Sequence, residues 1–341
     1  MGNADVVPRL FRATMHRAGA LLPVEGSMPS LDGATGWLNS PPLTTDELRG
    51  KVVLVQFWTY TCVNWLRTLP YVRAWSSKYE GLVVLGVHTP EFDFEHDLDN
   101  VRRAAGELRV DNPIAVDNDY AIWSAFANHY WPALYFVDAQ GRIRHHRFGE
   151  GGYEQSEMVL MRLLADAGAG DVGDDLVAVD ADGVGAPADW DNLRSPENYL
   201  GYERADNFAS PNGVVLATRH DYTAPARLPL NSWALAGAWT VQRQAAVLHE
   251  PDGRIAYRFH ARDLNLVVAP TARGSSVRFR VRLDGQPPGA AHGSDVDERG
   301  DGTVTDPRLY QLVRQPGPVT EHTFEITFLD PGVEAYAFTF G

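Results

Sequence analysis

The sequence predicts an α/β domain followed by an all-β sandwich of the jelly-roll type. Between residues 36 and 168, apolar runs of strand length alternate with helical periodicity, which indicates a layered α/β domain with a mostly parallel sheet and an antiparallel edge. Beyond residue 192, short stretches of alternating polar and apolar residues recur between turn signals such as EPDG and LDPG, which is typical of an antiparallel sandwich. A chain of 341 residues is also long for a single core, so two domains are expected.

Composition sets the expected domain boundaries. We assign residues 1–34 to an N-terminal arm, 35–168 to the α/β domain, 169–192 to a linker and 193–341 to the β-sandwich. The linker is rich in Gly, Ala and Asp and lacks periodicity, as connecting segments usually do.

Each element of the first domain has a local signal. The run KVVLVQFW at 51–58 is apolar and β-branched, which predicts a buried central strand. Apolar residues at helical spacing over 64–81 predict a helix that is kinked at Pro70. The same criteria predict strands at 82–90 and 112–117, a hairpin at 131–150, and helices at 95–110, 119–130 and 153–168.

In the second domain, alternating residues predict strands within 254–270, 275–285 and 322–341. No helical periodicity interrupts them, so the expected architecture is two packed antiparallel sheets.

Charge and hydropathy exclude several classes of function. The net charge of −14 would repel nucleic acid and anionic membrane surfaces. No run of 18 apolar residues is present, and the first 26 residues lack a signal-peptide core, so we expect no membrane insertion. The default expectation is a cytoplasmic protein, or an extracytoplasmic one if the chain is a fragment. Neither a cofactor nor a metal is expected, because one cysteine forms no zinc cluster and His145 and His146 point to opposite faces of a strand.

Cys62 is the only cysteine, and it stands between the predicted strand at 51–58 and the following helix. Free backbone N–H groups and the positive end of the helix dipole meet at such a junction. They stabilise a thiolate and lower the thiol pKa from about 8.5, which favours a reactive nucleophile. The alternative is that Cys62 is a small buried apolar residue.

The segment GKVVLVQFWTYTCVNWLRTLPYVRAW resembles thioredoxin-like domains of the TlpA/redoxin type. The resemblance is closest to the thioredoxin-like and carbohydrate-binding-module-like region of actinobacterial DipZ proteins. It continues through GVHTPEF, YWPALYFVDAQGRIRHHRFGEG and, in the second half, SPENYLGYERADNFASP and DPGVEAYAFTFG. It implies a thioredoxin fold, thiol–disulfide exchange, and protein or low-molecular-weight thiols and disulfides as partners.

The resemblance also implies roles for individual residues. Cys62 takes the position of the attacking thiol, and Pro132 that of a cis-proline beside the active site. Trp65 takes the position of the second, resolving cysteine, so the motif is CxxW instead of CxxC. Residues expected to surround the thiol are Thr59, Tyr60, Thr61, Asn64, Trp65 and Trp131.

Three interpretations of a lone attacking cysteine stay open. The first is monothiol exchange, in which an external thiol resolves the mixed disulfide. The second is a redox-inactive binding or scaffold protein, whose thiol Trp65 blocks. The third is a thiol-dependent peroxidase, because Thr59 precedes Cys62 as in Thr-x-x-Cys motifs, although Val55 stands where those motifs have proline.

Other polar and aromatic residues are secondary candidates. His88 and His129 are candidate neighbours of a thiolate, and Glu150 and Glu154 are candidate proton carriers. A carbohydrate ligand of the second domain would need exposed rings, for which the candidates are Trp233, Trp239, Tyr257 and Tyr310. The alternative is that these rings form the sandwich core.

Overall fold

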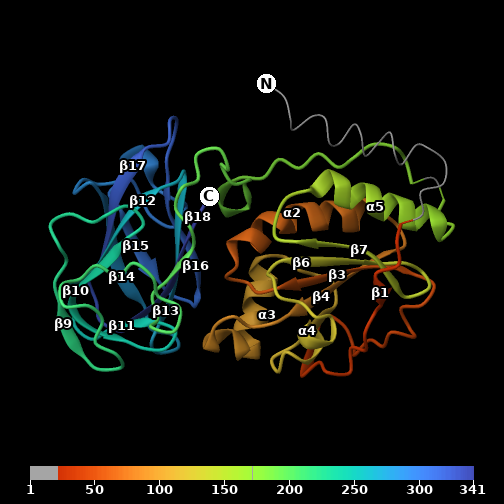
Figure 1. Ribbon diagram of the computed structural model, residues 1–341, viewed down its shortest axis with the longest axis horizontal. Coiled ribbons are helices and arrows are strands. Elements are labelled where there is room, and N and C mark those ends of the chain that lie inside the picture. The colour runs from red at the N-terminus through yellow and green to blue at the C-terminus, as the bar shows by residue number, and fades with distance from the viewer. Residues whose placement is uncertain (1–21, 171) are drawn as a thin grey trace. The chain divides into compact units, whose positions relative to one another are not determined.

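The computed structural model describes residues 22–170 and 172–341 and confirms an α/β unit followed by a β-sandwich (Figure 1). The chain divides into two compact units after Ala181, inside the segment expected to be a linker. Within the described residues, no helix is both long enough and apolar enough to span a membrane.

The first unit is built on a seven-stranded sheet in the order β1-β7-β6-β3-β4-β5-β2. The central strand β3 is buried along its whole length, as its β-branched sequence predicts. The strands are β1 (Gly26–Ser27), β2 (Gly36–Leu38), β3 (Val52–Trp58), β4 (Leu82–His88), β5 (Ile114–Val116), β6 (Ala133–Val137) and β7 (Arg142–Phe148).

The expected antiparallel edge is present, but the sheet as a whole is not mostly parallel. Only the pairings β3–β4 and β4–β5 are parallel. The hairpin β6–β7 joins β3 antiparallel, and the short strands β1 and β2 pair antiparallel with the outer strands β7 and β5. Those two N-terminal strands are too short to show periodicity in the sequence, so only their hydrogen bonds reveal them.

Helices cover both faces of this sheet. Side chains of α2 and α5 pack on Val52 and Leu54, whereas α4 packs on the opposite face, on Val55 and Phe57 (Figure 1). The predicted helix at 119–130 is much shorter in the structure, because Ala127 adopts a positive φ of 49° just beyond its end. The helical segments are α2 (Val63–Lys78), η1 (Asp93–His96), α3 (Leu98–Glu107), α4 (Ala121–Ala125) and α5 (Tyr153–Asp166).

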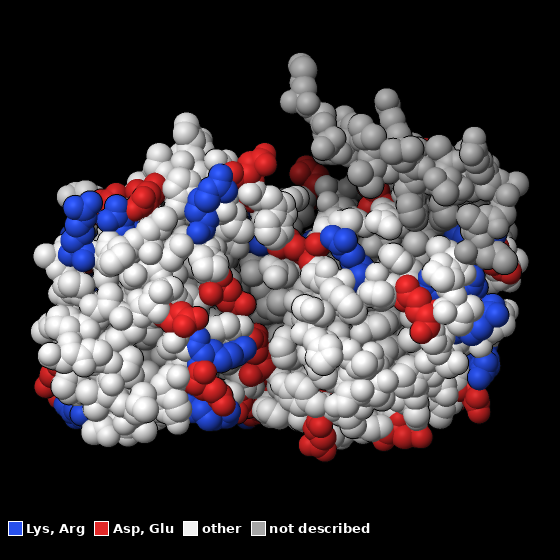
Figure 2. Space-filling model, viewed as in Figure 1, with Lys and Arg blue, Asp and Glu red and all other residues white. Residues whose placement is uncertain are grey.

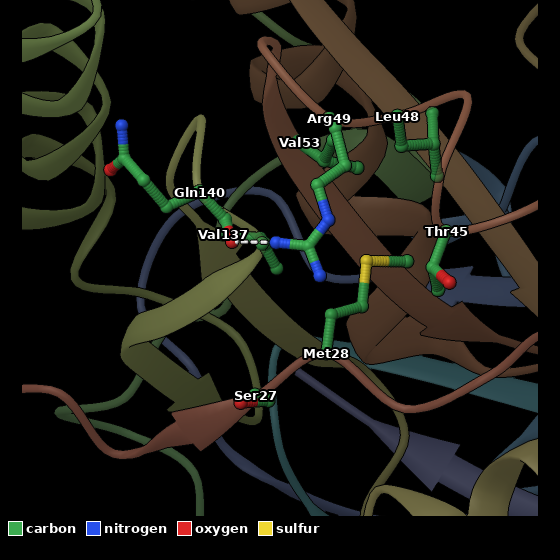
Figure 3. A pocket seen from close by; sticks show the side chains of 9 residues that line it. Ser27, Met28, Thr45, Leu48, Arg49, Val53, Val137 and Gln140 are labelled. Atoms are coloured by element: carbon green, nitrogen blue, oxygen red, sulfur yellow. Dashed lines mark hydrogen bonds between the residues drawn. The ribbon is translucent and has the colours of Figure 1, made fainter.

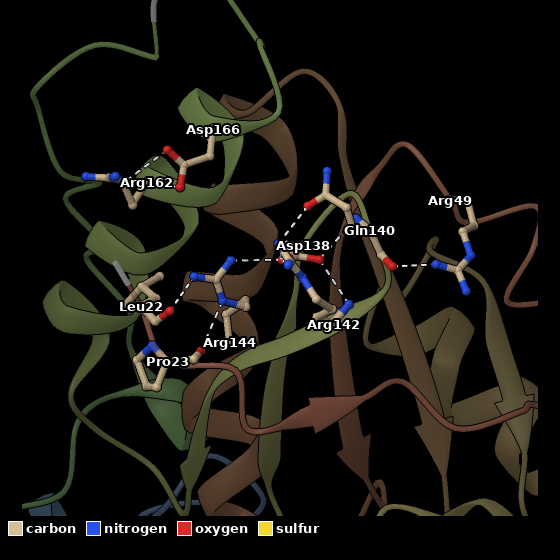
Figure 4. Close-up of polar contacts among 9 residues, drawn as sticks. All are labelled: Leu22, Pro23, Arg49, Asp138, Gln140, Arg142, Arg144, Arg162 and Asp166. Carbon is tan, nitrogen blue, oxygen red and sulfur yellow. Dashed lines mark hydrogen bonds and ion pairs between the residues drawn. The ribbon is translucent and has the colours of Figure 1, made fainter. Parts of the chain in front are cut away.

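A polar cluster at the β6–β7 turn fixes the beginning of the described chain (Figure 4). Asp138 accepts hydrogen bonds from Arg142 Nε and Arg144 Nη1, each at 2.9 Å, and Arg144 also donates to the carbonyls of Leu22 and Pro23. Burial alone would raise the pKa of Asp138, but the hydrogen bonds from the two arginines outweigh it and hold the pKa below its usual value. The charged aspartate therefore stabilises both the turn and the attached N-terminal segment.

The second unit is an antiparallel sandwich that closes on one core. Its main strand path is β15-β14-β17-β12-β10-β11-β18-β13-β16, with β8 and β9 added to β18 and β10. The segments are η2 (Gly183–Gly185), β8 (Asn198–Tyr199), β9 (His220–Tyr222), β10 (Trp233–Val241), β11 (Ala246–Leu248), β12 (Gly253–His260), β13 (Asp263–Pro270), β14 (Val277–Leu283), η3 (Gly289–Ala291), β15 (Asp301–Val304), β16 (Arg308–Arg314), β17 (Glu321–Phe328) and β18 (Val333–Phe340).

Strand β10 belongs to both sheets of the sandwich. Its first half pairs with β12 and its second half with β11, and the change occurs at Gly237, whose φ is +96°. Strands that pass between packed sheets need such a bend. Rings from the two sheets then meet in the core, for example Tyr257 against Phe338 with centroids 4.9 Å apart.

Candidate active site

Cys62 lies at the N-terminal end of α2, directly beyond the central strand. Strand β3 ends at Trp58, residues 59–61 form the turn, and Cys62 is the N-cap of the helix, with φ −75° and ψ 110°. Its carbonyl accepts the amide of Leu66 at 3.0 Å, so the helical hydrogen bonds begin at this residue. Cys62 as a residue is half-buried.

Pro132 is brought beside the thiol from a distant part of the sequence. The Trp131–Pro132 peptide bond is cis, and the Trp131 carbonyl lies 3.7 Å from Cys62 Sγ. The Trp131 indole donates to the Thr89 carbonyl at 3.1 Å, and the Pro132 carbonyl accepts the Gly149 amide at 2.8 Å. These contacts hold the loop before β6 against the ends of β4 and β7.

Trp65 points into the core of the first unit. It is completely buried, and its ring stacks on Trp58 with centroids 4.3 Å apart. The same cluster contains Leu69 of α2 and Val101 of α3, and the partly buried Cys62 packs against it. Trp65 therefore contributes to the core on which the start of α2 rests.

The residues that precede Cys62 are buried against the segment after β4. Thr59, Tyr60 and Thr61 are nearly inaccessible, and Thr61 Oγ1 donates to Glu95 Oε1 at 2.6 Å. Glu95 is itself fully buried, and burial raises its pKa to about 7. Glu95 was missed in the sequence, where the only signal is an acidic residue among the phenylalanines of EFDFEHD.

The structure separates the other candidates from the thiol chemistry. His88 is fully buried between the rings of Trp58 and Tyr60, and burial lowers its pKa to about 3, so it stays neutral. Glu150 is buried in an ion pair with Arg67 at 3.0 Å, and burial raises its pKa although the Arg67 charge opposes the shift. Asn64 contributes its carbonyl to the Thr68 hydroxyl, and His129 is exposed beside Tyr130.

Comparison with known proteins agrees with this geometry. Residues 195–341 match the family described as the thioredoxin-like C-terminal domain. The chain is 39% identical over 269 residues to Protein DipZ of Mycobacterium bovis, a match that covers 77% of this chain and 37% of DipZ. It is 36% identical over 141 residues to the thiol-disulfide oxidoreductase YkuV of Bacillus subtilis, a match that covers 41% of this chain and 95% of YkuV.

The chain belongs to the thioredoxin-like family. This confirms the resemblance drawn from the sequence. A solved thioredoxin-like protein in its oxidized form shares 33% identity, covering 41% of this chain and 96% of that chain with a TM-score of 0.38. The thioredoxin-like chain spans only 37% of the length of the DipZ proteins that it matches.

A hollow elsewhere in the thioredoxin-like unit is unrelated to the thiol. It lies at the start of β3, whereas Cys62 follows the end of that strand (Figure 3). Arg49 crosses it and donates to the Gln140 carbonyl at 2.5 Å. Its lining consists of Ser27, Met28, Thr45, Leu48, Arg49, Val53, Val137, Gln140 and Gly141. In the described part of the chain, no group of three or more His, Cys, Asp or Glu side chains could hold a metal ion.

The hypothesis of an aromatic sugar platform in the second unit is wrong for the four rings named. Trp233, Trp239, Tyr257 and Tyr310 are at most 1% exposed. Their faces pack on other core residues, and Trp233 Nε1 and Trp239 Nε1 donate to backbone carbonyls. A sugar ring could not reach them without unfolding the sandwich.

Proposed function

We propose that this thioredoxin-like protein catalyses thiol–disulfide exchange through Cys62 alone, with an external thiol in place of a second cysteine. The observation that carries the proposal is the position of the half-buried Cys62 at the start of α2, with its Sγ 3.7 Å from the carbonyl that precedes the cis-proline. The relative YkuV is named a thiol-disulfide oxidoreductase, which supports the same chemistry.

The reaction consists of two exchanges. The Cys62 thiolate attacks one sulfur of a protein or low-molecular-weight disulfide, forms a mixed disulfide and releases the other sulfur as a thiolate. A second, external thiolate then attacks the mixed disulfide, which regenerates the Cys62 thiolate and yields a new disulfide. The free amides at the start of α2 favour the thiolate, and they support each step in which Cys62 is the nucleophile or the leaving group.

The burial of Trp65 favours this proposal over a blocked thiol. Its ring packs on Trp58 in the core, and the half-buried Trp131 places its carbonyl 3.7 Å from Cys62 Sγ. Because α2 carries tryptophan where a resolving thiol would stand, the mixed disulfide persists until an external thiolate attacks it.

The test is the pH dependence of Cys62 alkylation, followed by mass spectrometry after exposure to glutathione disulfide. Because the chain has one cysteine, every adduct reports on Cys62, and Cys62→Ser is the matched control. A midpoint below about 7, with an adduct that a free thiol removes, supports monothiol exchange. A midpoint above about 9, or no labelling of the folded protein, would instead identify a redox-inactive binding protein.

A further inference from the structure

Glu95 is a buried carboxyl that contacts the turn carrying Cys62. It lies in η1, just after β4, and its side chain has no exposed surface. Oε1 accepts the Thr61 hydroxyl at 2.6 Å, and Oε2 accepts the amides of Glu91 and Phe92 at 2.6 Å and 3.0 Å. One carboxyl thus joins the segment after β4 to the residue immediately before the nucleophile.

The donors to this carboxyl are neutral, so its charge is not balanced by them. Burial is the main cause that raises the pKa of Glu95 to about 7; hydrogen bonds from hydroxyls and the Phe92 amide lower it, and the nearby Glu91 raises it. The pH at which Glu95 changes its charge therefore lies inside the range in which a thiol at a helix N-terminus ionises.

Two buried neighbours keep their charge in this range, while Asp93 and His96 are further titratable groups on η1 itself. Burial raises the pKa of Tyr60 far above neutrality and lowers that of His88 to about 3, so both side chains stay neutral. The charge of Asp97 raises the pKa of Tyr60, and the charge of Arg103 lowers it. Glu95 is thus the buried group beside the turn whose proton is in exchange near pH 7.

We propose that Glu95 is a positioning residue for Cys62: its carboxyl holds Thr61, and its charge controls how readily the thiol loses its proton. Two negative charges in a weakly polar surrounding disfavour each other. Ionisation of Glu95 therefore favours the protonated thiol, and a proton on Glu95 favours the thiolate. The inference rests on the proposed function, since it concerns the reactivity of the same thiol.

The test measures iodoacetamide alkylation of Cys62 from pH 5 to pH 10 in the full-length protein and two variants. Glu95→Gln keeps the shape of the side chain and removes its charge. Glu157→Gln is the matched control, because Glu157 is equally buried but pairs with Lys78 at the other end of α2. We expect Glu95→Gln to lower the alkylation midpoint by about one pH unit, and Glu157→Gln to leave it unchanged.

The outcomes separate this inference from the proposed function. An unchanged midpoint in Glu95→Gln, with a reactive Cys62, would overturn the role of Glu95 and leave monothiol exchange intact. An inert Cys62 in the unaltered protein would overturn both. Equal shifts in both variants would also reject the role of Glu95, because they would reflect a general loss of packing.

If Glu95→Gln does not fold, a second measurement still tests the proposal. Coupled groups influence each other equally, so removal of the thiol must change the titration of Glu95 if the two interact. The infrared band of the protonated buried carboxyl should vanish at a lower pH in Cys62→Ala than in the unaltered protein. An identical titration in the two proteins would contradict the proposal.

Discussion

At the scale of single residues, Trp65 shows why the second cysteine is not simply missing. Its indole is fully buried and stacks on Trp58, so it contributes to the core beneath α2. A smaller side chain at this position would leave a cavity whose walls relax only in part. Under the proposed monothiol mechanism, the residue that stands in place of a resolving cysteine is therefore also a residue on which the fold depends.

We expect Trp65→Cys to lower the free energy of unfolding by about 3 kcal/mol or more, since replacing a buried tryptophan by a small residue typically costs 3–5 kcal/mol. Urea unfolding with a reductant present measures the loss without a contribution from a new disulfide. Trp65→Phe keeps an aromatic ring against Trp58, so its free energy of unfolding should fall clearly less than that of Trp65→Cys. If both variants lost under 1 kcal/mol, the packing role assigned to Trp65 would be wrong.

Glu95 should make stability depend on pH in a defined direction. Its pKa rises from 4.5 to about 7 on folding, so the folded protein holds a proton that the unfolded chain releases. The stabilisation from that proton is complete below about pH 4.5 and is lost as the pH rises through 7. A pKa shift of this size corresponds to about 3 kcal/mol in the free energy of unfolding. We expect Glu95→Gln to remove this pH dependence of stability.

The measurement is the free energy of unfolding of both proteins at pH 5 and pH 8. The variant should gain stability relative to the unaltered protein between these two values, because only the unaltered protein then carries an uncompensated buried charge. A difference that stays constant with pH would mean that Glu95 titrates normally.

At the scale of elements, Gly237 allows one strand to serve two sheets. Its φ is +96°, and a Cβ there would lie 3.2 Å from Gly253 Cα. We expect Gly237→Ala to cost about 2–3 kcal/mol in chemical unfolding, from the left-handed backbone and the close approach together. Gly213→Ala is the control: its φ is also positive, at +75°, but a Cβ there would meet nothing within 4 Å. Equal losses in the two variants would show that the close approach contributes nothing.

The elements also show what sequence reasoning could reach. Strand β3 was predicted because its seven residues are buried on both faces, and β14 because polar and apolar residues alternate. Strand β10 was not predicted, since its alanines and glycine give no alternation and its pairing changes midway.

The candidate site was found only in part for a similar reason. The resemblance to thioredoxin-like domains singled out Cys62, Trp65 and Pro132 in the sequence. The inward orientation of Trp65 and the burial of Glu95 depend on contacts between separate elements, which no local pattern records.

At the scale of the whole molecule, the chain carries a large net negative charge. The net charge is −14, and acidic and basic side chains are interspersed over the face shown in Figure 2. Such a surface gives little attraction to polyanions, so recognition of a disulfide partner depends on the immediate surroundings of Cys62.

The two units have separate cores, which predicts separate unfolding. The described core clusters draw either on residues before Ala181 or on residues after it. Cooperative unfolding follows the extent of a shared core. We expect two transitions in calorimetry, with Trp65→Phe lowering only one midpoint and Gly237→Ala only the other. If either variant moved both transitions together, the units would be energetically coupled, and substitutions in the sandwich should then also alter the reactivity of Cys62.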